Sequence, residues 1–331
     1  MNDSFIHACA GGAGGVLAMT ATYPLMTIST RAAVETRKDP EKSLIEAAGK
    51  IVQEEGVSGL YSGLNSSLIG VGVSNFVYYF FFEKCRDVIL TSKNRLAAAN
   101  AATEGAKIAA GGALTTLESM LAGAIAGSAT TMISNPIWVI NTRQTIRTQQ
   151  PAPSKQGGSG QVQKVKKLSF FETIAHVKKT DGITAFWKGL GPALVLVINP
   201  ILQYTAYEQL RALVLDGKRK RGAIVRLSDL EVFFLGALSK LFATGLTYPQ
   251  IVIKSRQQSG GKGSSNVWTA MTDIVNKEGF SGLYKGIFTK LIQSVLTAAL
   301  LFASKERIYE ITKKALVPVA AAAAQAPGVK N

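Results

Sequence analysis

Residues that form disulfides and metal sites are scarce in this sequence. The 331 residues include only two cysteines, Cys9 and Cys85, and two histidines, His7 and His176. Two cysteines in or beside apolar segments are too few for a disulfide framework, and we expect them to pack as small apolar side chains. The two histidines are far apart in the sequence and lack neighbouring ligand residues, so no metal site is predicted.

Sequence patterns of nucleotide-dependent enzymes are also missing. Neither the phosphate-binding pattern G-x-x-x-x-G-K-[ST] nor the dinucleotide pattern G-x-G-x-x-G opens a strand-to-helix unit in this chain. An ATPase or a dehydrogenase would need such a loop to hold phosphates at the start of a helix. We therefore expect no enzymatic activity and no resident cofactor.

Acidic residues are much fewer than basic ones. The chain has 21 Asp and Glu against 37 Lys and Arg, which gives a formal net charge of +16. The basic residues are spread over the loops, and the clusters at 164–167 and 218–221 have no aromatic residues between their charges. Nucleic-acid binding is therefore not predicted. The charge instead favours contact with anionic lipid and anionic solutes.

What the chain does have is a segment that occurs three times. Pro24, Pro136 and Pro249 lie about 112 residues apart, and each closes an apolar stretch. Each is followed seven residues later by an arginine, namely Arg31, Arg143 and Arg256. We call this proline-to-arginine segment the signature. Because such spacing rarely recurs by chance, the chain is predicted to consist of tandem repeats.

A second motif follows each signature, and the spacing from its acidic-Gly pair to its aromatic-x-Gly end is identical in all three copies. It reads EGVSGLYSG from Glu55, DGITAFWKG from Asp181 and EGFSGLYKG from Glu278. The two motifs together predict three repeats and a tail. The predicted boundaries are 1–104 for the first repeat, 105–220 for the second with a flexible insertion at about 148–166, 221–314 for the third, and 315–331 for a disordered tail.

Each repeat carries two apolar stretches that are long enough to cross a membrane. Apolar residues make up 47% of the chain, and a helix of about 20 apolar residues spans a bilayer core. A shorter amphipathic stretch lies between the two apolar ones and is typical of a helix at the membrane surface. The predicted fold is therefore an all-α membrane protein with six transmembrane helices in three two-helix repeats, with short surface helices on one side.

The signature and the acidic-Gly motif, three times over six helices, resemble the mitochondrial carrier family. The resemblance covers residues 5 to 312. It implies a pseudo-threefold barrel of helices around a central cavity. It also implies alternating access, in which one of two charge-paired gates closes while the other opens. We call the gate beside the signatures the signature gate and the other the opposite gate.

The signature gate departs from the pattern that the resemblance implies, which places an acid two residues after the proline and a base three residues later. Here the acidic positions hold Met26, Trp138 and Ile251, and the first basic positions hold Ser29, Asn141 and Lys254. A ring of ion pairs cannot form with this set. We expect apolar packing and hydrogen bonds to close this gate, with Gln144 and Gln257 bracing it, and the closed state to be weaker.

The opposite gate keeps more of its charges. Its residues are Glu83, Arg86, Glu208, Arg211 and Glu306, with Tyr309 where a third base would lie. The resemblance implies pairs between neighbouring helices, Glu83 with Arg211 and Glu306 with Arg86. The alternative is that these are solvated charges at helix ends.

Aligning the second helix of each repeat on these acids places several polar side chains on one helical face. With Asn75 and the intramembrane Lys240, these give the candidate substrate-binding residues Lys290, Asn75, Tyr78, Asn199, Gln203, Ser294 and Lys240. A charged residue inside a membrane helix suggests function, and Lys290 is the candidate for binding a phosphate. The alternatives are that Lys290 extends to the membrane interface and that Lys240 packs against a neighbouring helix.

Stretches such as SNFVYYFFFE and INPILQYTAYEQL resemble the peroxisomal adenine nucleotide carrier branch. This resemblance implies a multi-pass protein of the peroxisomal membrane that exchanges ATP for AMP or ADP and supports fatty-acid activation and β-oxidation. The implied partners are nucleotide, membrane lipid and peroxisomal membrane-protein import factors. Three alternatives remain: a carrier of coenzyme A, FAD or NAD, a carrier of the mitochondrial inner membrane, and a non-transporting membrane scaffold.

Overall fold

The computed structural model describes residues 3–35, 44–104, 114–146, 168–222, 226–260 and 266–300, and these form helices and turns with no strand. The elements are α1 (Asp3–Val34), α2 (Leu44–Glu55), η1 (Val57–Tyr61), α3 (Leu64–Glu104), α4 (Thr116–Ile146), α5 (Phe170–Asp181), η3 (Ile183–Trp187), α6 (Leu190–Val195), η4 (Leu196–Ile198), α7 (Asn199–Lys220), α8 (Asp229–Gln258), α9 (Val267–Glu278) and η5 (Phe280–Tyr284). Residues 287–300 are also helical. The predicted insertion at 148–166 and the tail at 315–331 lie outside the described residues.

The helices follow the predicted plan of each repeat. Within the described residues, the predicted apolar stretches are helical, with one interruption in the second repeat, and the three predicted surface helices are α2, α5 and α9. By length and apolar composition alone, two helical segments among the described residues qualify as membrane spans, Ile183–Lys220 and Leu230–Gln258. The all-α plan is thus confirmed.

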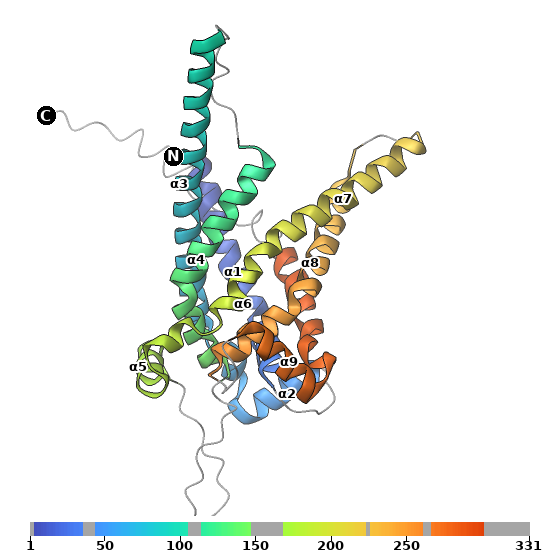
Figure 1. Cartoon of the computed structure of the whole chain (residues 1–331). Helices are drawn as coiled ribbons and strands as arrows, with labels where there is room; N and C mark the ends of the chain where they lie inside the picture. The colour runs from blue at the N-terminus through green and yellow to red at the C-terminus, as the bar shows by residue number, and fades with distance from the viewer. Residues whose placement is uncertain are drawn as a thin grey trace, which may run out of the picture. The chain divides into compact units, whose positions relative to one another are not determined.

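The chain divides into two compact units. The first comprises Met1–Ser29, Lys42–Leu64 and Gly286–Asn331, and the second comprises Thr30–Glu41 and Asn65–Lys285. In the second unit, α7 and α8 run antiparallel to each other, and α3 runs alongside α4 (Figure 1). This unit holds the last turn of α1 and all of α4 and α8, so it contains the three signature arginines.

Each signature proline lies inside a helix and is supported by the residue before it. A proline removes one backbone hydrogen bond and bends the helix, and neighbouring groups must then hold the bend. In all three repeats the preceding side chain donates to the carbonyl that comes just before the glycine of the aromatic-x-Gly turn. These contacts are Tyr23 to Ser62 at 3.3 Å, Asn135 to Lys188 at 3.2 Å and Tyr248 to Lys285 at 2.9 Å. The bend and the turn of each repeat are thereby joined.

The stacking of aromatic rings repeats this arrangement in the first and third repeats. The rings of Tyr23 and Tyr61 stack with centroids 6.4 Å apart, and those of Tyr248 and Tyr284 stack at 6.2 Å. Stacked aromatic pairs add to the stability gained from burying their area. The second repeat has Asn135 at this position, which uses hydrogen bonds instead.

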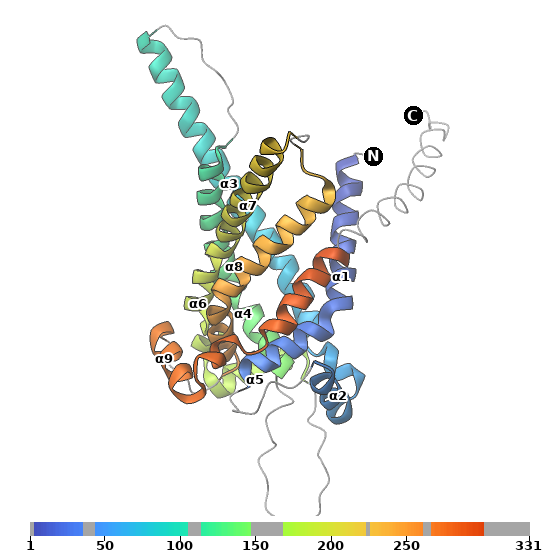
Figure 2. The same ribbon diagram turned by 90° about the vertical axis from the view of Figure 1, so that its right-hand side faces the viewer.

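Helix α3 is longer than the apolar pattern predicts. The apolar stretch ends near residue 90, but the helix continues to Glu104. Residues 97–103 are rich in alanine, the strongest helix former. Figure 2 shows the last turns of α3 extending beyond the start of α4.

The second helix of the second repeat is interrupted, where the sequence predicts one continuous stretch. It begins as α6, tightens into the 3₁₀ segment η4 and continues as α7. Pro200, in the first turn of α7, has no N–H to donate to the preceding turn. The interruption positions the side chain of Asn199.

Two lysines, one on α3 and one on α7, each contact the start of the next long helix, α4 or α8. Lys93 lies 2.7 Å from Glu118 at the start of α4, and Lys218 lies 2.7 Å from Glu231 at the start of α8. Each glutamate also accepts a hydrogen bond from the N-cap residue of its own helix. These contacts hold α3 to α4 and α7 to α8.

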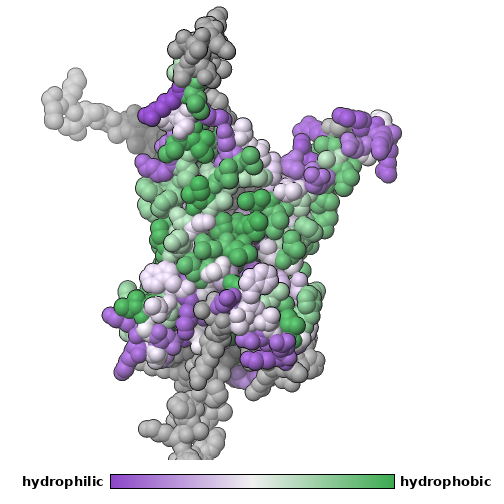
Figure 3. Space-filling view, viewed as in Figure 1, coloured by the Kyte–Doolittle hydropathy of each residue, from purple (hydrophilic) through white to green (hydrophobic). Residues whose placement is uncertain are grey.

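The outer surface of the second unit is apolar over the middle of its long helices. Figure 3 shows apolar side chains gathered over α4 and α7, and hydrophilic ones over α5 and over the far end of α7. Exposed apolar side chains on α4 include Leu121, Ile125 and Ile133, each more than half exposed. An apolar band between polar ends fits the hydrocarbon core of a bilayer.

Candidate functional site

The three signature arginines join the carboxyl-terminal ends of α1, α4 and α8 in a closed ring, which we call the arginine ring. In each contact an arginine Nε donates to a carbonyl oxygen of the next helix. The contacts are Arg31 to Thr145 at 2.9 Å, Arg143 to Gln258 at 2.8 Å and Arg256 to Ala33 at 2.9 Å. Each acceptor lies two residues beyond the signature arginine of its own helix. Since the last carbonyls of a helix have no partner within it, cations there are stabilising.

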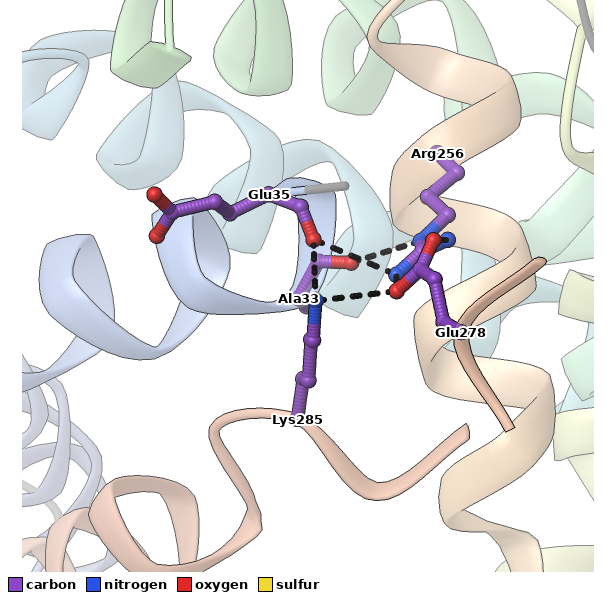
Figure 4. A network of polar contacts seen from close by, with 5 residues as sticks. All are labelled: Ala33, Glu35, Arg256, Glu278 and Lys285. Atoms are coloured by element: carbon purple, nitrogen blue, oxygen red, sulfur yellow. Dashed lines mark hydrogen bonds and ion pairs between the residues drawn. The ribbon is translucent and has the colours of Figure 1, made fainter. Parts of the chain in front are cut away.

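A cluster of buried charges reinforces the ring in the third repeat (Figure 4). Arg256 donates twice to the carboxylate of Glu278, at 2.5 and 2.9 Å, and Lys285 Nζ lies 2.9 Å from the same carboxylate. Lys285 and Arg256 also donate to the carbonyl of Glu35, at 3.1 and 3.3 Å. The Glu278 side chain is only 5% exposed. This cluster joins α8, α9 and the turn after η5 to the end of α1.

The electrostatics of Glu278 favour its ionised form. Burial alone would raise the pKa of its carboxyl, because a charge is poorly solvated in the interior. The hydrogen bonds from Arg256 and Lys285, with their positive charges, outweigh that effect and leave the pKa below its ordinary value. Glu278 is therefore expected to be charged at neutral pH.

The second repeat has a simpler version of this contact. Arg143 Nη2 lies 2.5 Å from Asp181, whose side chain is 24% exposed. The lysine at the position of Lys285 is Lys188, which forms no ion pair within the described part of the chain. Gly260 lies against the guanidinium of Arg143 in a left-handed conformation, with φ of +89°, and a Cβ at this position would collide with that group. A glycine is thus required beside Arg143.

Gln258 is a ring residue that the sequence analysis did not identify. Its carbonyl accepts from Arg143, its side-chain oxygen accepts from Thr142 at 3.1 Å, and its amide donates to Asn135 at 3.3 Å. Gln258 thus connects the end of α8 to α4 on both sides of the proline bend. Gln144, which was expected to brace the gate, instead donates to the carbonyl of Leu168 just before α5. The described hydrogen bond of Gln144 is thus to the segment before α5 and not to a gate residue.

Two uncharged gate residues of α4 form hydrogen bonds to α3. Asn141 donates to the hydroxyls of Ser66 and Ser67, at 3.1 and 2.6 Å. The indole of Trp138 donates to Ser74 at 3.3 Å. Neutral hydrogen bonds thus replace ion pairs at these two positions of the second repeat, as the sequence predicts.

Helix α8 carries two lysines on the face that points away from its exposed apolar residues. Lys240 is exposed and Lys254 is half-buried. At 3.6 residues per turn, Lys240 lies opposite Leu238 and Phe242, which are 52% and 59% exposed. Thr247 lies midway between the lysines on their face. Because the apolar face is the one suited to lipid, the lysine face points inward.

Asn199 reaches this inward face from α7. Its amide donates to Thr247 at 2.7 Å and more weakly to the carbonyl of Ala243 at 3.4 Å. The amide oxygen of Asn199 has no hydrogen bond to the described residues. Asn199 therefore joins α7 to α8 beside the two lysines and still has an acceptor to offer.

Two other candidate residues lie on α3. Asn75 is exposed and occupies the same face as Tyr78, one turn away. Tyr78 is half-buried and stacks on Phe82 with ring centroids 5.8 Å apart. Its hydroxyl approaches Gly123 of α4, where a Cβ would lie 3.3 Å from it. Asn75 is thus available for binding, and Tyr78 is held between two helices.

The remaining candidates differ in what surrounds them. Gln203 on α7 is half-buried and forms no side-chain hydrogen bond within the described ranges. Lys290 and Ser294 lie in the first unit, on the helix at 287–300, and both are half-buried. The hydroxyl of Ser294 donates to the carbonyl of Lys290 at 2.9 Å. Lys240 and Lys254 thus lie along one face of α8, and Asn199 bonds to Thr247 between them in the sequence, while Lys290 and Ser294 belong to another unit.

In that first unit, the helix at 287–300 contacts α1 through hydroxyl groups. Thr22 and Thr297 lie 2.8 Å apart, and Gln293 donates to Thr297 at 3.2 Å. A polar contact of this kind holds two membrane helices together. Thr297 and Asn199 each lie nine residues before the gate acid of their own repeat, Glu306 or Glu208. Each hydrogen-bonds to a threonine of the adjacent signature helix.

The opposite-gate charges pair within their own helices. Arg86 lies 3.0 Å from Glu83, and Arg211 lies 3.4 Å from Glu208, each one turn away. All four side chains are between 39% and 55% exposed. The pair between Glu83 and Arg211 that the resemblance implied is not formed in this conformation, because both groups are occupied in their own helix. Glu306 lies outside the described residues.

The carboxylates of the acidic-Gly motif are the main functional residues that the sequence analysis missed. Asp181 and Glu278 were used only as markers of the repeat, yet both bind a signature arginine. The available signal was the recurrence in the sequence of one arginine and one acidic residue at corresponding positions of each repeat. No group of three or more His, Cys, Asp or Glu side chains in the described ranges is placed to hold a metal ion.

Comparison with known proteins agrees with this arrangement. A family model described as mitochondrial carrier protein matches residues 2–93, 112–218 and 226–316. The chain is 38% identical to the peroxisomal nicotinamide adenine dinucleotide carrier of Arabidopsis thaliana, covering 95% of this chain and 97% of that protein.

Two fungal relatives are also similar. Peroxisomal membrane protein PMP47B of Candida boidinii is 32% identical, covering 92% of this chain and 86% of the relative. Peroxisomal adenine nucleotide transporter 1 of Saccharomyces cerevisiae is 27% identical, covering 93% and 92%. With three matched repeats and relatives of nearly the same length, this chain belongs to the mitochondrial carrier family, whose members are membrane transporters and not enzymes.

Proposed function

We propose that this protein is a multi-pass carrier of the peroxisomal membrane that transports adenine-containing nucleotides. The first candidate is the exchange of ATP for AMP or ADP, which would support fatty-acid activation and β-oxidation. The inward face of α8 carries the proposal, because it presents two lysines beside hydroxyl and amide groups inside an apolar helix. The lysines could bind the phosphates of a nucleotide, and the hydroxyl and amide groups could hydrogen-bond to its base or ribose.

NAD is a second candidate. The relative with 38% identity is named as a carrier of that dinucleotide, whereas the relative named for adenine nucleotides is 27% identical. NAD and ATP share the adenosine 5′-phosphate group. A site that binds this shared group would accept either class, and the internal counter-substrate then distinguishes them.

The proposed location follows from the same relatives. The three relatives described above are named as peroxisomal. Fluorescence microscopy of the tagged full chain beside peroxisomal and mitochondrial markers tests the location. Coincidence with the mitochondrial marker alone would contradict it.

We infer that this conformation is closed at the signature gate and open at the opposite gate. The arginine ring joins α1, α4 and α8 at one end, while the opposite-gate residues Glu83, Arg86, Glu208 and Arg211 pair only within α3 and within α7. Transport would also require a second conformation, in which the signature gate is open and the opposite gate is closed. Bound nucleotide promotes this switch between the two gates only if it binds the intermediate conformations more tightly than the two resting conformations.

Uptake into liposomes tests the function. The purified protein is reconstituted into liposomes that contain AMP, ADP, NAD, coenzyme A, FAD or no substrate, and uptake of labelled ATP and of labelled NAD is measured. Uptake of ATP that depends on internal AMP or ADP would support the first candidate. NAD uptake without ATP uptake would support the second, and no uptake by folded protein under any condition would favour a non-transporting scaffold.

A further inference from the structure

Helix α8 contains two polar groups without a partner, four residues apart. The side-chain oxygen of Gln250 is buried and accepts no hydrogen bond. Lys254 is half-buried and has no hydrogen bond or ion pair with any described side chain or carbonyl. Residues at this spacing are neighbours on a helix surface. An acceptor and a cation therefore lie side by side on α8, one turn after the proline bend.

The surrounding groups do not satisfy them. At the position of α4 that corresponds to Lys254, Asn141 is bonded to two serines. The nearby carboxylates are occupied, since Asp181 binds Arg143 and Glu278 binds Arg256 and Lys285. The acidic gate positions on α4 and α8 hold Trp138 and Ile251. Nothing in the described part of the second unit neutralises Lys254.

Leaving such groups unpaired is costly. A buried polar atom without a hydrogen bond loses the solvation that it had in water, and a charged residue within a membrane helix is costly to insert. A leucine or methionine at either position would avoid that cost. The two groups are better explained by a ligand that brings both a negative charge and a hydrogen-bond donor.

We propose that Lys254 and Gln250 form a phosphate-binding subsite for the transported nucleotide, separate from the one around Lys240. Lys254 binds a phosphate oxygen, and the oxygen of Gln250 accepts a hydrogen bond from a hydroxyl or amino group of the same molecule. This subsite rests on the proposed function. It lies 14 residues, or about 21 Å, along α8 from Lys240, so the two lysines are successive contacts along the transport path.

Transport kinetics of matched variants test the subsite. Lys254→Gln, Lys254→Arg and Gln250→Leu are compared with Lys277→Gln, which removes a charge from the exposed end of α9. The substrates are nucleotides with one, two and three phosphates. We expect Lys254→Gln to raise KM at least tenfold, and to raise it more as phosphates are added. Lys254→Arg should preserve KM, Gln250→Leu should raise it a few-fold, and the control should leave it unchanged.

Two results would overturn the subsite. One is a fall in Vmax with KM unchanged for every nucleotide, which indicates a role in gate movement only. The other is a loss of thermal stability in Lys254→Gln and in Gln250→Leu without any effect on KM, which indicates that Lys254 and Gln250 bind each other. The Tm of each variant in detergent separates these outcomes from misfolding.

Failure of the proposed function gives a different result. If the wild-type protein takes up no nucleotide, the function is wrong, and the subsite is then judged by binding alone. Tripolyphosphate should raise the Tm of the wild-type protein and of Lys277→Gln but not that of Lys254→Gln. Equal stabilisation of all three proteins would overturn the subsite as well.

Discussion

The signature end and the opposite gate hold their charged residues in different ways. At the signature end, arginines cross from helix to helix and meet buried carboxylates. At the opposite gate, the charges on α3 and α7 are partly exposed, and each pairs one turn away in the same helix. A pair between helices resists their separation, whereas a pair within one helix does not. The difference shows that charged residues of the signature end join neighbouring helices in this conformation, whereas those of the opposite gate do not.

The largest effect is expected from Glu278→Gln. This substitution leaves Arg256 and Lys285 without their buried carboxylate. Breaking a buried ion pair on one side typically costs about 3–5 kcal/mol, so the Tm in detergent should fall by several degrees. Glu54→Gln removes an exposed acid of α2 that pairs with Lys50 and serves as the control. If both variants melt alike, the cluster does not fasten the signature end.

The pH dependence of stability should follow from the same carboxyl. The pKa of Glu278 is lower in the folded protein than its ordinary value, so ionisation contributes stability above the ordinary pKa. That contribution is lost as the pH falls through the lowered pKa. The Tm of the wild-type protein should therefore drop in acid more steeply than that of Glu278→Gln. Parallel curves for the two proteins would contradict this origin.

A smaller effect is expected in the second repeat. Asp181 has a single cationic partner and is more exposed than Glu278. A hydrogen bond to a charged group contributes about 1.5–3 kcal/mol, so Asp181→Asn should lower the Tm less than Glu278→Gln does. The reverse order would show that Lys285 adds nothing to the third repeat.

The smallest effect on stability is expected at the opposite end. Glu83→Gln breaks an exposed pair within α3, and exposed pairs contribute about 0.2–1 kcal/mol. The Tm should hardly change, while transport should slow if Glu83 pairs with another helix when that end closes. A large loss of Tm would mean that the contact already joins two helices.

The sequence was sufficient to predict the repeats and most of the helices. The prolines, the amphipathic stretches and the acidic-Gly turns are local patterns, and α2, α5 and α9 lie where they were expected. The loss of charge at Trp138 and Asn141 correctly indicated neutral contacts on α4. Local spacing carries these features because each depends on residues within one repeat.

Contacts between repeats were not predictable from that spacing. The acceptors of the arginine ring are backbone carbonyls, which leave no mark in the sequence. Gln258 was missed because its three partners lie over 100 residues away. The break at η4 and the pairing of Glu83 with Arg86 depend on the conformation that the helices adopt. Such features require the helices to be placed in space.

We propose that the signature gate and the opposite gate open and close alternately during transport. Cysteines introduced at positions 83 and 211, in a chain with Cys9 and Cys85 replaced by serine, report closure of the opposite end. We predict that a disulfide between them forms faster when nucleotide is present, that it blocks uptake into liposomes, and that reduction restores uptake. A disulfide that forms without slowing uptake, or one that never forms while transport continues, would contradict the account.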